Sequence, residues 1–583
     1  MVGKLSVFSK RVVILLCIAA IAACGLVLRF LHLFSAGHYY ILSADSYFFD
    51  WQAHKLLSGE SIPMSLHGGL TYPLAYLARA IGFVFHQSPE DALKVAGLVL
   101  PPMLGVLSLI VIYLAVSRIY GKSVGLLSAL VWAILIRAVL LQDAGYVDRD
   151  GLSLLLIMTG ALIFALSGDW HWRVHGLDLG WVKATLPILA IEALLFLEWV
   201  WLGPFLLVAI LVAALAAEIL VLFWRRLFSG LPAEDDPVAL AFGLLKRSPG
   251  SLANALKTSN WRPVALITGL STSVAAARPG LGYLYSQAIG IIRDTLASKA
   301  QVGELQGLSL SDLISYGPLL VPLVIGLYIS WRNSRRGEFL CLGWFVGFFL
   351  AGVFARRIFW YAMPAGCVIS GLGLASLLQF GTLRLSMADL ARALYNLADF
   401  LRYALVGVAV LLLLLSILFG TIGAYRLGSD PRMSANSDWQ AALLYLKDNT
   451  SERAVIMNWW DYGYWVLDLA ERQPVVHNGY HSDEADHDIA IAYVTTEASE
   501  VVRIMQKYSA DYLIFSKVEY AILPVMTGYA LGQAYGNGQS IPKEMRDSIY
   551  SRSLSGDFQL SGDLQRIYPP PGSEAEVVIL ARG

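Results

Sequence analysis

The run VVILLCIAAIAACGLVLRFLHLF at residues 12–34 decides the class of fold, because it is apolar almost without interruption. A helix needs roughly 20 apolar residues to cross about 30 Å of hydrocarbon, and this run is long enough. It lacks a small-residue cleavage site and is longer than the apolar part of a signal peptide. We therefore interpret it as a retained membrane helix.

Similar apolar runs recur along the first 424 residues and predict about eleven membrane-spanning helices. They lie around 12–34, 95–117, 123–142, 152–167, 182–198, 200–223, 264–277, 313–331, 338–355, 358–378 and 403–424. Weaker apolar stretches near 70–85 and 280–292 are expected to be interfacial helices or further spans, so the expected total is about 11 to 13.

The overall composition agrees with a membrane protein and excludes some classes of function. Of the 583 residues, 57% are hydrophobic and 15% are charged, which is too apolar for a soluble protein of several domains. The 43 basic and 43 acidic residues cancel, which argues against a nucleic-acid-binding protein. The four cysteines lie in apolar runs without metal-ligand spacing, and we interpret them as packing residues.

Basic residues mark one side of the membrane. Lysine and arginine gather before the first apolar run and then in alternate loops, which predicts a cytoplasmic N-terminus. With an odd number of spans, the outer side then receives everything after about residue 424 and the loops at about 36–94, 142–151 and 278–312.

From residue 425 to residue 583 the chain turns polar and predicts a small α/β domain. Ser437-Asp438-Trp439-Gln440 has the pattern of a capping box and opens a helix with Trp439, Ala442, Leu443 and Leu446 on one face. Strand-like runs follow at 454–458, 474–477, 512–515 and 577–580.

Three aspartates lie near the ends of predicted spans on the outer side. Asp45 follows the first span, and Asp148 and Asp150 precede the fourth. Charges at membrane depth are costly and tend to mark function, although a solvated helix cap is an equal alternative for each. The spacing Asp148-x-Asp150 favours function, because two carboxylates in an extended loop can reach one divalent cation such as Mg²⁺ or Mn²⁺.

The motif WWDYG at residues 459–463 follows a predicted strand and precedes a helical run at 465–470. Strand-to-helix junctions often carry active-site loops. Two adjacent indole N–H groups and one carboxylate can surround a single hydroxyl group. The alternative, an aromatic packing cluster, explains any single tryptophan but explains a five-residue pattern with Asp and Gly less well.

This motif resembles the hallmark of the catalytic subunit of oligosaccharyltransferases, and the resemblance extends over nearly the whole chain. It implies a polytopic GT-C glycosyltransferase fold at residues 1–424 and an outer α/β domain at 425–583. It also implies transfer of a glycan en bloc from a polyprenyl diphosphate to the asparagine of an Asn-x-Ser/Thr sequon. Trp459, Trp460 and Asp461 would hold the hydroxyl group at the +2 position of that sequon.

Other motifs of that family can be placed in order along the chain. Asp45 resembles the first-loop aspartate, and Asp148 and Asp150 resemble the second-loop pair, so that the three would bind Mn²⁺ or Mg²⁺ together. QVGE at 301–304 resembles the S/T-V/I-x-E motif, with a departure at its first residue and with Glu304 in place. Arg357, which opens RIFWYAMP, resembles the arginine that contacts the lipid-linked diphosphate; a topogenic or snorkelling arginine is the alternative.

Further resemblances lie in the outer domain. Ile522 resembles the isoleucine of the bacterial M-x-x-I motif, although Glu519 stands where the methionine would be, and His481 resembles a family histidine expected at the diphosphate. A polar stretch surrounds it, which we interpret as a solvated loop rather than a metal site; its members are His477, Asp483, Asp486, His487 and Asp488.

An arginine that pairs with an acidic −2 residue in Campylobacter-type enzymes is replaced here by Ser315 and Tyr316, which predicts a relaxed need for acid at −2.

The resemblance implies a mechanism. An amide nitrogen is a poor nucleophile because its lone pair is delocalised. Asp45 and Glu304 are expected to weaken that conjugation, and Asp150, Arg357 and the metal to stabilise the leaving diphosphate in a single inverting displacement.

We expect a monomer of the bacterial inner membrane with a periplasmic outer domain. The expected partners are a lipid-linked oligosaccharide, an acceptor polypeptide and membrane lipids, without nucleic acid. The alternatives are another polyprenyl-sugar glycosyltransferase, which would lack WWDYG, and a transporter, whose charges should lie inside helices.

Overall fold

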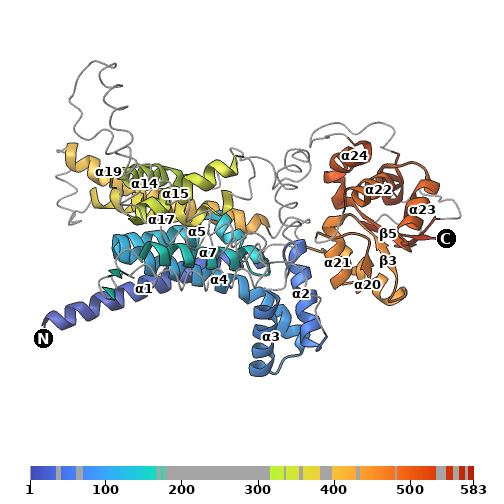
Figure 1. Cartoon of the computed structure of the whole chain (residues 1–583), viewed down its shortest axis with the longest axis horizontal. Helices are drawn as coiled ribbons and strands as arrows, with labels where there is room; N and C mark the ends of the chain where they lie inside the picture. Colours follow the sequence, from blue (N-terminus) through green and yellow to red (C-terminus); the bar gives the residue numbers. More distant parts are fainter. Residues whose placement is uncertain are drawn as a thin grey trace, which may run out of the picture.

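The computed structural model has two parts, a bundle of long apolar helices and an α/β domain at the opposite end of the long axis (Figure 1). The described residues are 2–34, 41–60, 70–166, 173–174, 177–178, 316–333, 336–353, 359–380, 397–427, 434–478, 482–532, 547–555, 564–570 and 576–583. Helices α2 (Ala44–Leu57) and α3 (Thr71–Phe85) lie where the two parts meet.

Helices occupy the predicted apolar runs wherever those runs are described. The bundle comprises α1 (Val2–Phe30), η1 (Leu31–Phe34), α4 (Pro89–Tyr120), α5 (Lys122–Ile134), α6 (Ile136–Leu140), α7 (Arg149–Leu166), η3 (Gly317–Leu319), α14 (Leu320–Asn333), α15 (Arg336–Gly352), α17 (Met363–Phe380) and α19 (Leu397–Leu427). The runs at 182–198, 200–223 and 264–277 and the stretch at 280–292 lie outside the described residues.

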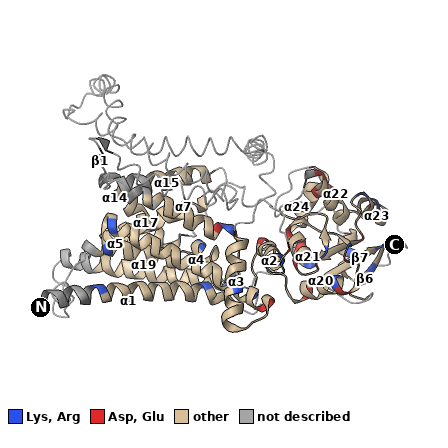
Figure 2. Cartoon of the chain, turned by 60° about the horizontal axis from the view of Figure 1, so that its bottom comes forward, with Lys and Arg blue, Asp and Glu red and all other residues tan. Residues whose placement is uncertain are grey.

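Length and composition allow three helices of the described part to cross a membrane, at Arg11–Phe34, Pro89–Tyr120 and Ala404–Arg426. Shorter apolar helices pack beside them. Lys, Arg, Asp and Glu are sparse on the bundle and gather on α2, α3 and the α/β domain (Figure 2). This separation of charge is the pattern of an integral membrane protein with a water-exposed part.

Close helix contacts in the bundle depend on glycine. Helix α17 packs on both α14 and α5. A Cβ atom at Gly326 of α14 would overlap with the backbone of α17, and one at Gly371 of α17 would overlap with Ser128 of α5. Small residues let apolar helices approach closely enough for van der Waals packing to hold them, since burial from water cannot do so inside lipid.

The α/β domain is built on a five-stranded sheet in the order β4-β3-β5-β7-β6. Strands β4, β3 and β5 are parallel, whereas β7 is antiparallel to both β5 and β6. The bounds are β3 (Val455–Met457), β4 (Gln473–Pro474), β5 (Tyr512–Ser516), β6 (Leu564–Tyr568) and β7 (Val577–Arg582). Each of the four predicted strands overlaps an observed strand, although β4 shares only Pro474 with the predicted run at 474–477, and β6 is an addition. A separate two-stranded pair joins β1 (Arg173–Val174) to β2 (Leu177–Asp178).

Helices pack against this sheet, and the first has a different cap from the predicted one. They are α20 (Ser437–Asn449), α21 (Gly463–Asp468), α22 (Asp483–Val494), α23 (Ala498–Lys507), α24 (Leu523–Leu531) and α26 (Ile549–Ser555), with short helices η4 (Trp460–Tyr462) and η5 (Lys517–Ile522). The N-cap of α20 is Asn436, whose side chain accepts from the backbone N–H groups of Asp438 and Trp439, so the expected capping box at Ser437 is wrong by one residue. Its predicted apolar face is buried.

One hydrophobic core extends from the first outer loop into the α/β domain. The ring of Tyr47 lies 5.8 Å from that of Trp465, and the ring of Phe48 lies 4.6 Å from that of Tyr464. The Tyr47 hydroxyl also accepts from the backbone N–H of Ala435 at 3.0 Å. Helix α2 is therefore packed directly on α21, the helix that begins with the last residue of WWDYG.

Candidate active site

The WWDYG motif forms the turn between strand β3 and helix α21, as predicted. Its glycine is needed for close packing, because a Cβ atom at Gly463 would overlap with the carbonyl oxygen of Val476. Trp459 is only 2% exposed, and its ring packs edge-on against Tyr529 of α24 at 5.6 Å. The strand that precedes the motif and the helix that follows it fix its backbone on both sides.

The two tryptophans of the motif differ in their surroundings. Trp459 is buried, whereas Trp460 and Asp461, at the start of η4, keep part of their surface exposed. Ile522, the predicted sequon contact, is also partly exposed and ends η5, directly before α24. Because Tyr529 of α24 packs on Trp459, the structure brings the segment that carries Ile522 against the motif.

Asp45 lies where two outer loops and the α/β domain meet. It is in the first turn of α2, and its Oδ1 atom accepts a hydrogen bond from Nδ2 of Asn478 at 2.8 Å. Three residues before it, the backbone N–H of Leu42 donates to the carbonyl of Gly145 at 2.8 Å, in the loop that leads to Asp148. The structure therefore joins the first-loop aspartate to both the second loop and the domain with WWDYG.

Asp148 and Asp150 are both buried, at 6% and 3% exposure. Asp150 is in the first turn of α7, and its Oδ1 atom accepts a hydrogen bond from the hydroxyl of Tyr361 at 3.0 Å. Tyr361 is the tyrosine of the run RIFWYAMP at residues 357–364. That run and the D-x-D pair are therefore neighbours, although Arg357 itself lies outside the described residues.

A buried polar network beside the loop that leads to Asp148 and Asp150 was not predicted from the sequence. The Arg29 guanidinium, 2% exposed, donates to the carbonyl of Gly25 at 3.0 Å and to Oε1 of Gln142 at 3.1 Å. His32 Nδ1 lies 3.1 Å from Oδ1 of Asp143. The backbone carbonyl of Arg29 also accepts from the N–H of Ala144 at 2.8 Å, so this network holds the start of the loop with Asp148 and Asp150. An arginine inside an apolar run was the signal in the sequence.

The predicted metal ligands have suitable chemistry but do not form a complete site. Carboxylate oxygens are the ligands that Mg²⁺ and Mn²⁺ prefer. The backbone bond between Leu42 and Gly145 brings their loops side by side. Among the residues that the structure describes, no three His, Cys, Asp or Glu side chains form a group that could hold a metal ion. The shared site of Asp45, Asp148 and Asp150 stays a prediction.

Other predicted residues lie outside the described ranges or in a different setting. Glu304, Arg357 and His481 are not described, and neither is Ser315. Tyr316 is 2% exposed and packs against the rings of Phe345 and Phe359.

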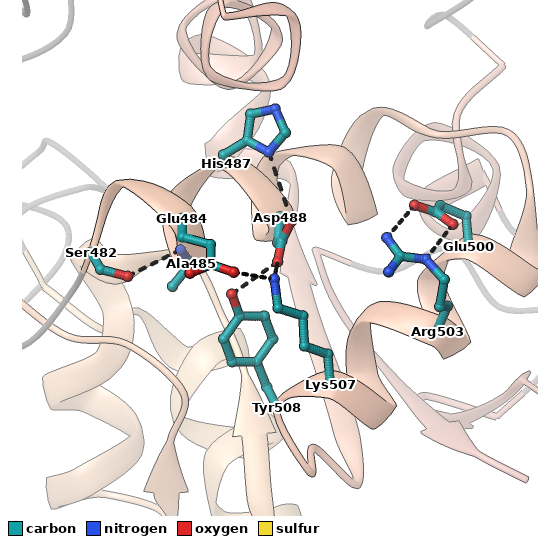
Figure 3. A network of polar contacts seen from close by, with 9 residues as sticks. All are labelled: Ser482, Glu484, Ala485, His487, Asp488, Glu500, Arg503, Lys507 and Tyr508. Carbon is teal, nitrogen blue, oxygen red and sulfur yellow. Dashed lines mark hydrogen bonds and ion pairs between the residues drawn. The ribbon is translucent and has the colours of Figure 1, made fainter.

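The polar stretch after WWDYG is mostly helix, so its interpretation as a loop is wrong. Asp483–Val494 forms α22, capped by Ser482, whose hydroxyl accepts from the N–H of Ala485 (Figure 3). Asp488 accepts from Lys507 and from the hydroxyl of Tyr508, which together outweigh the effect of burial and keep the pKa of Asp488 below its usual range. These contacts tie α22 to α23.

Comparison with known proteins gives matches among archaeal glycosyltransferases. A family model described as the AglB core domain matches residues 451–519. Dolichyl-phosphooligosaccharide-protein glycotransferase 2 of Pyrococcus horikoshii is 28% identical over 185 residues, which cover 31% of this chain and 22% of that protein. Glycotransferase 1 of Pyrococcus furiosus is 33% identical over 86 residues, which cover 14% and 9%. The matched segment thus spans under a quarter of the length of these relatives.

Solved structures match over a much larger part of the chain. One match is the archaeal oligosaccharyltransferase AglB of Archaeoglobus fulgidus in complex with an inhibitory peptide and a dolichol-phosphate. Its TM-score is 0.68 at 16% identity, and the match covers 96% of this chain and 80% of the AglB chain. An Archaeoglobus fulgidus oligosaccharyltransferase tethered to an acceptor peptide with the NVT sequon has a TM-score of 0.65 at 17% identity, covering 95% and 79%. The chain has the fold of these archaeal enzymes. The expectation of a bacterial single-subunit type stays a prediction.

Proposed function

We propose that this chain is an oligosaccharyltransferase, which moves a glycan from a polyprenyl diphosphate to asparagine in Asn-x-Ser/Thr sequons. The hydrogen bond between Asn478 and Asp45 carries the proposal. It joins the domain that contains the acceptor motif to the first-loop aspartate, in a chain with the fold of such enzymes. This contact supports a site at which residues for acceptor recognition and for transfer act together.

The proposed acceptor site lies between the WWDYG turn and the η5–α24 segment. Trp459, Trp460 and Asp461 hold the +2 hydroxyl group, and Ile522 contacts the methyl group of a +2 threonine. The packing of Trp459 on Tyr529 supports this assignment, because it places both segments around the same turn. Binding energy from this remote hydroxyl orients the asparagine that reacts.

The proposed transfer uses carboxylates to activate the amide. Asp45 and Glu304 accept hydrogen bonds from the two amide N–H groups and weaken the conjugation of the C–N bond. The nitrogen then attacks the anomeric carbon and passes one of its protons to a carboxylate. The bond to the diphosphate oxygen breaks, the diphosphate leaves with the bonding electron pair, and the configuration inverts. Asp45 is well placed for this role, because Asn478 orients its carboxylate from the acceptor domain.

The diphosphate site of this proposal comprises Arg357, His481 and the three aspartates of the outer loops. A bound Mn²⁺ or Mg²⁺ would neutralise charge on the departing diphosphate. Asp45, Asp148 and Asp150 would hold that ion, and Tyr361 orients Asp150 through its hydroxyl. The burial of Asp148 and Asp150 supports a role at the site, since charged side chains near membrane depth tend to mark function.

The proposal also includes location and acceptor preference. The N-terminus is cytoplasmic and the α/β domain is periplasmic, in a bacterial inner membrane. An acidic residue at position −2 of the acceptor is not required. The burial of Tyr316 among aromatic rings supports this preference, because that position offers no cation to a −2 carboxylate.

The test is glycosyl transfer by the purified full chain with lipid-linked oligosaccharide and a fluorescent Asn-x-Thr peptide, with Mn²⁺ or with EDTA. A Gln-x-Thr peptide serves as the control acceptor. We expect a mobility shift of the asparagine peptide only, and loss of both transfer and divalent-ion dependence in Asp150→Ala. Absence of transfer from every lipid-linked donor offered would contradict the function. Full activity of Asp150→Ala, or of the wild type in EDTA, would contradict the metal assignment.

A further inference from the structure

Glu519 differs from the methionine expected at its position, and the structure places it inside the domain. It lies in η5, three residues before Ile522, and its side chain is 0% exposed. A fully buried carboxyl group is costly unless hydrogen bonds or neutralisation compensate for it. Its partners therefore indicate what it does.

The partners of Glu519 connect it to the backbone of the WWDYG turn. Its Oε2 atom accepts from the N–H of Ser516 at 2.7 Å, and its Oε1 atom lies 3.0 Å from the hydroxyl oxygen of Tyr493. The same hydroxyl oxygen accepts from the backbone N–H of Trp459 at 3.2 Å. Tyr493, on α22, thus bridges Glu519 to the first residue of the acceptor motif.

Counting protons decides the state of this bridge. A tyrosine hydroxyl carries one hydrogen, and that of Tyr493 has two acceptors within reach. The carbonyl oxygen of Ile514 is 2.8 Å away, and Oε1 of Glu519 is 3.0 Å away. If Glu519 carries a proton, it donates to Tyr493, Tyr493 donates to Ile514, and every contact is satisfied. If Glu519 is ionised, one of the two acceptors loses its hydrogen bond.

The surroundings of Glu519 favour the protonated form. Burial, helped by the nearby charge of Asp461, raises its pKa to about 8, against the opposing hydrogen bonds from Ser516 and Tyr493. The ionisable groups that face it are Asp461 of η4, Tyr493 of α22 and Tyr550 of α26. Within the described ranges, no Lys, Arg or His forms an ion pair with it.

We propose that Glu519 is a positioning residue that acts as a neutral acid and, through Tyr493, fixes the backbone of Trp459 and hence the sequon pocket. This inference rests on the proposed function for its effect on the acceptor. Tyr493 is fully buried and ties the WWDYG turn to the η5 segment that ends at Ile522. Ionisation of Glu519 loosens that tie and weakens acceptor binding.

Kinetics of the full chain against pH test this inference. In the wild type, KM for an Asn-x-Thr peptide should rise above pH 8 by up to about tenfold per pH unit, with a smaller change in kcat. Glu519→Gln should keep a low KM at all pH values, because its amide N–H donates to Tyr493 permanently while its carbonyl accepts from Ser516. Tyr493→Phe should raise KM at every pH. Glu500→Gln, at a partly exposed residue paired with Arg503, is the matched control and should keep the wild-type profile.

Hydrogen exchange at the amide of Trp459 gives a second readout that needs no transfer activity. Its protection, corrected for the intrinsic pH dependence of exchange, should fall above pH 8 in the wild type, persist in Glu519→Gln and be absent in Tyr493→Phe. Equal pH profiles of KM and of protection in the wild type and Glu519→Gln would overturn the inference. If no variant and no wild-type sample transfers glycan, but hydrogen exchange follows the expected pattern, the proposed function is refuted and the bridge from Glu519 to Trp459 is supported.

Discussion

Removal of the Asn478 side chain should slow transfer without unfolding the protein. Asn478 Nδ2 donates to Oδ1 of Asp45 at 2.8 Å, and it is a direct contact between the acceptor domain and the first-loop aspartate. A hydrogen bond to an ionised group is worth about 1.5–3 kcal/mol. If the full amount acts on the transition state, Asn478→Ala should lower kcat by about 10- to 100-fold, since each 1.4 kcal/mol is a factor of about ten.

Asn478→Asp should lower transfer activity more than Asn478→Ala does, because it replaces the hydrogen-bond donor with a second carboxylate beside Asp45. Two like charges about 4 Å apart repel by about 4 kcal/mol at an effective dielectric constant of 20. Two carboxylates this close share a proton as the pH falls, which removes the repulsion. The activity of Asn478→Asp should therefore recover on acidification, whereas that of Asn478→Ala should not.

The assay is transfer to a fluorescent Asn-x-Thr peptide between pH 5.5 and 8. This range begins about one pH unit above the ordinary pKa of a carboxyl group and ends about four units above it. Asn449→Ala is the matched control, because Asn449 is exposed at the end of α20 and donates to the backbone carbonyl of Tyr445 at 3.0 Å. Asn478→Ala and Asn449→Ala with the same kcat, or Asn478→Asp as active as Asn478→Ala at every pH, would refute the reasoning.

Three further predictions concern the other contacts. Tyr361→Phe removes the hydrogen bond to Asp150 and should lower kcat about tenfold in the same assay; an unchanged kcat would contradict it. Gly105→Ala places a Cβ atom 2.5 Å from Nε of Arg29 and should cost about 1–3 kcal/mol, seen as a lower Tm in detergent; equal Tm values would contradict it. The pKa of Glu519 is raised to about 8, so the free energy of unfolding should fall between pH 4.5 and 8 by about 1.4 kcal/mol per pH unit. Glu519→Gln should remove this slope in denaturation measurements. Equal slopes in the wild type and the variant would contradict the prediction.

The sequence predicted elements whose signal is local. Apolar runs became helices wherever the structure describes them, and the buried face of α20 matched its period. The cap of α20 was missed because Asn436 and Ser437 are both good N-caps, and the extended backbone of Asn436 decides between them. Helix α22 had usable signals, a capping Ser482 and the buried residues Ala485 and Ile489, which its many charges obscured.

Elements that depend on distant partners could not be predicted in the same way. Strand β6 contains a charged Arg566 and is held at the edge of the sheet by pairing with β7. Its stability comes from that pairing rather than from its own pattern.

In the candidate site, sequence motifs predicted the types of residue but not their contacts. Asp45 and Asn478 are separated by 433 positions, and no periodicity connects them. The same limit explains Glu519. Its departure from the motif was visible in the sequence, but its burial against Tyr493 follows only from the packing of α22 on the η5–α24 segment.

The continuous core between α2 and the α/β domain fixes the position of Asp45 relative to the WWDYG turn. If the outer domain were loosely attached, a single hydrogen bond at Asn478 could not set the distance between the sequon pocket and Asp45. The packing of Tyr47 and Phe48 on α21 removes that freedom, since α21 begins at the last residue of WWDYG. In the proposed function, binding of the +2 hydroxyl group at the turn would therefore fix where the asparagine lies relative to α2. Sequon recognition and amide activation would then both depend on one packed interface.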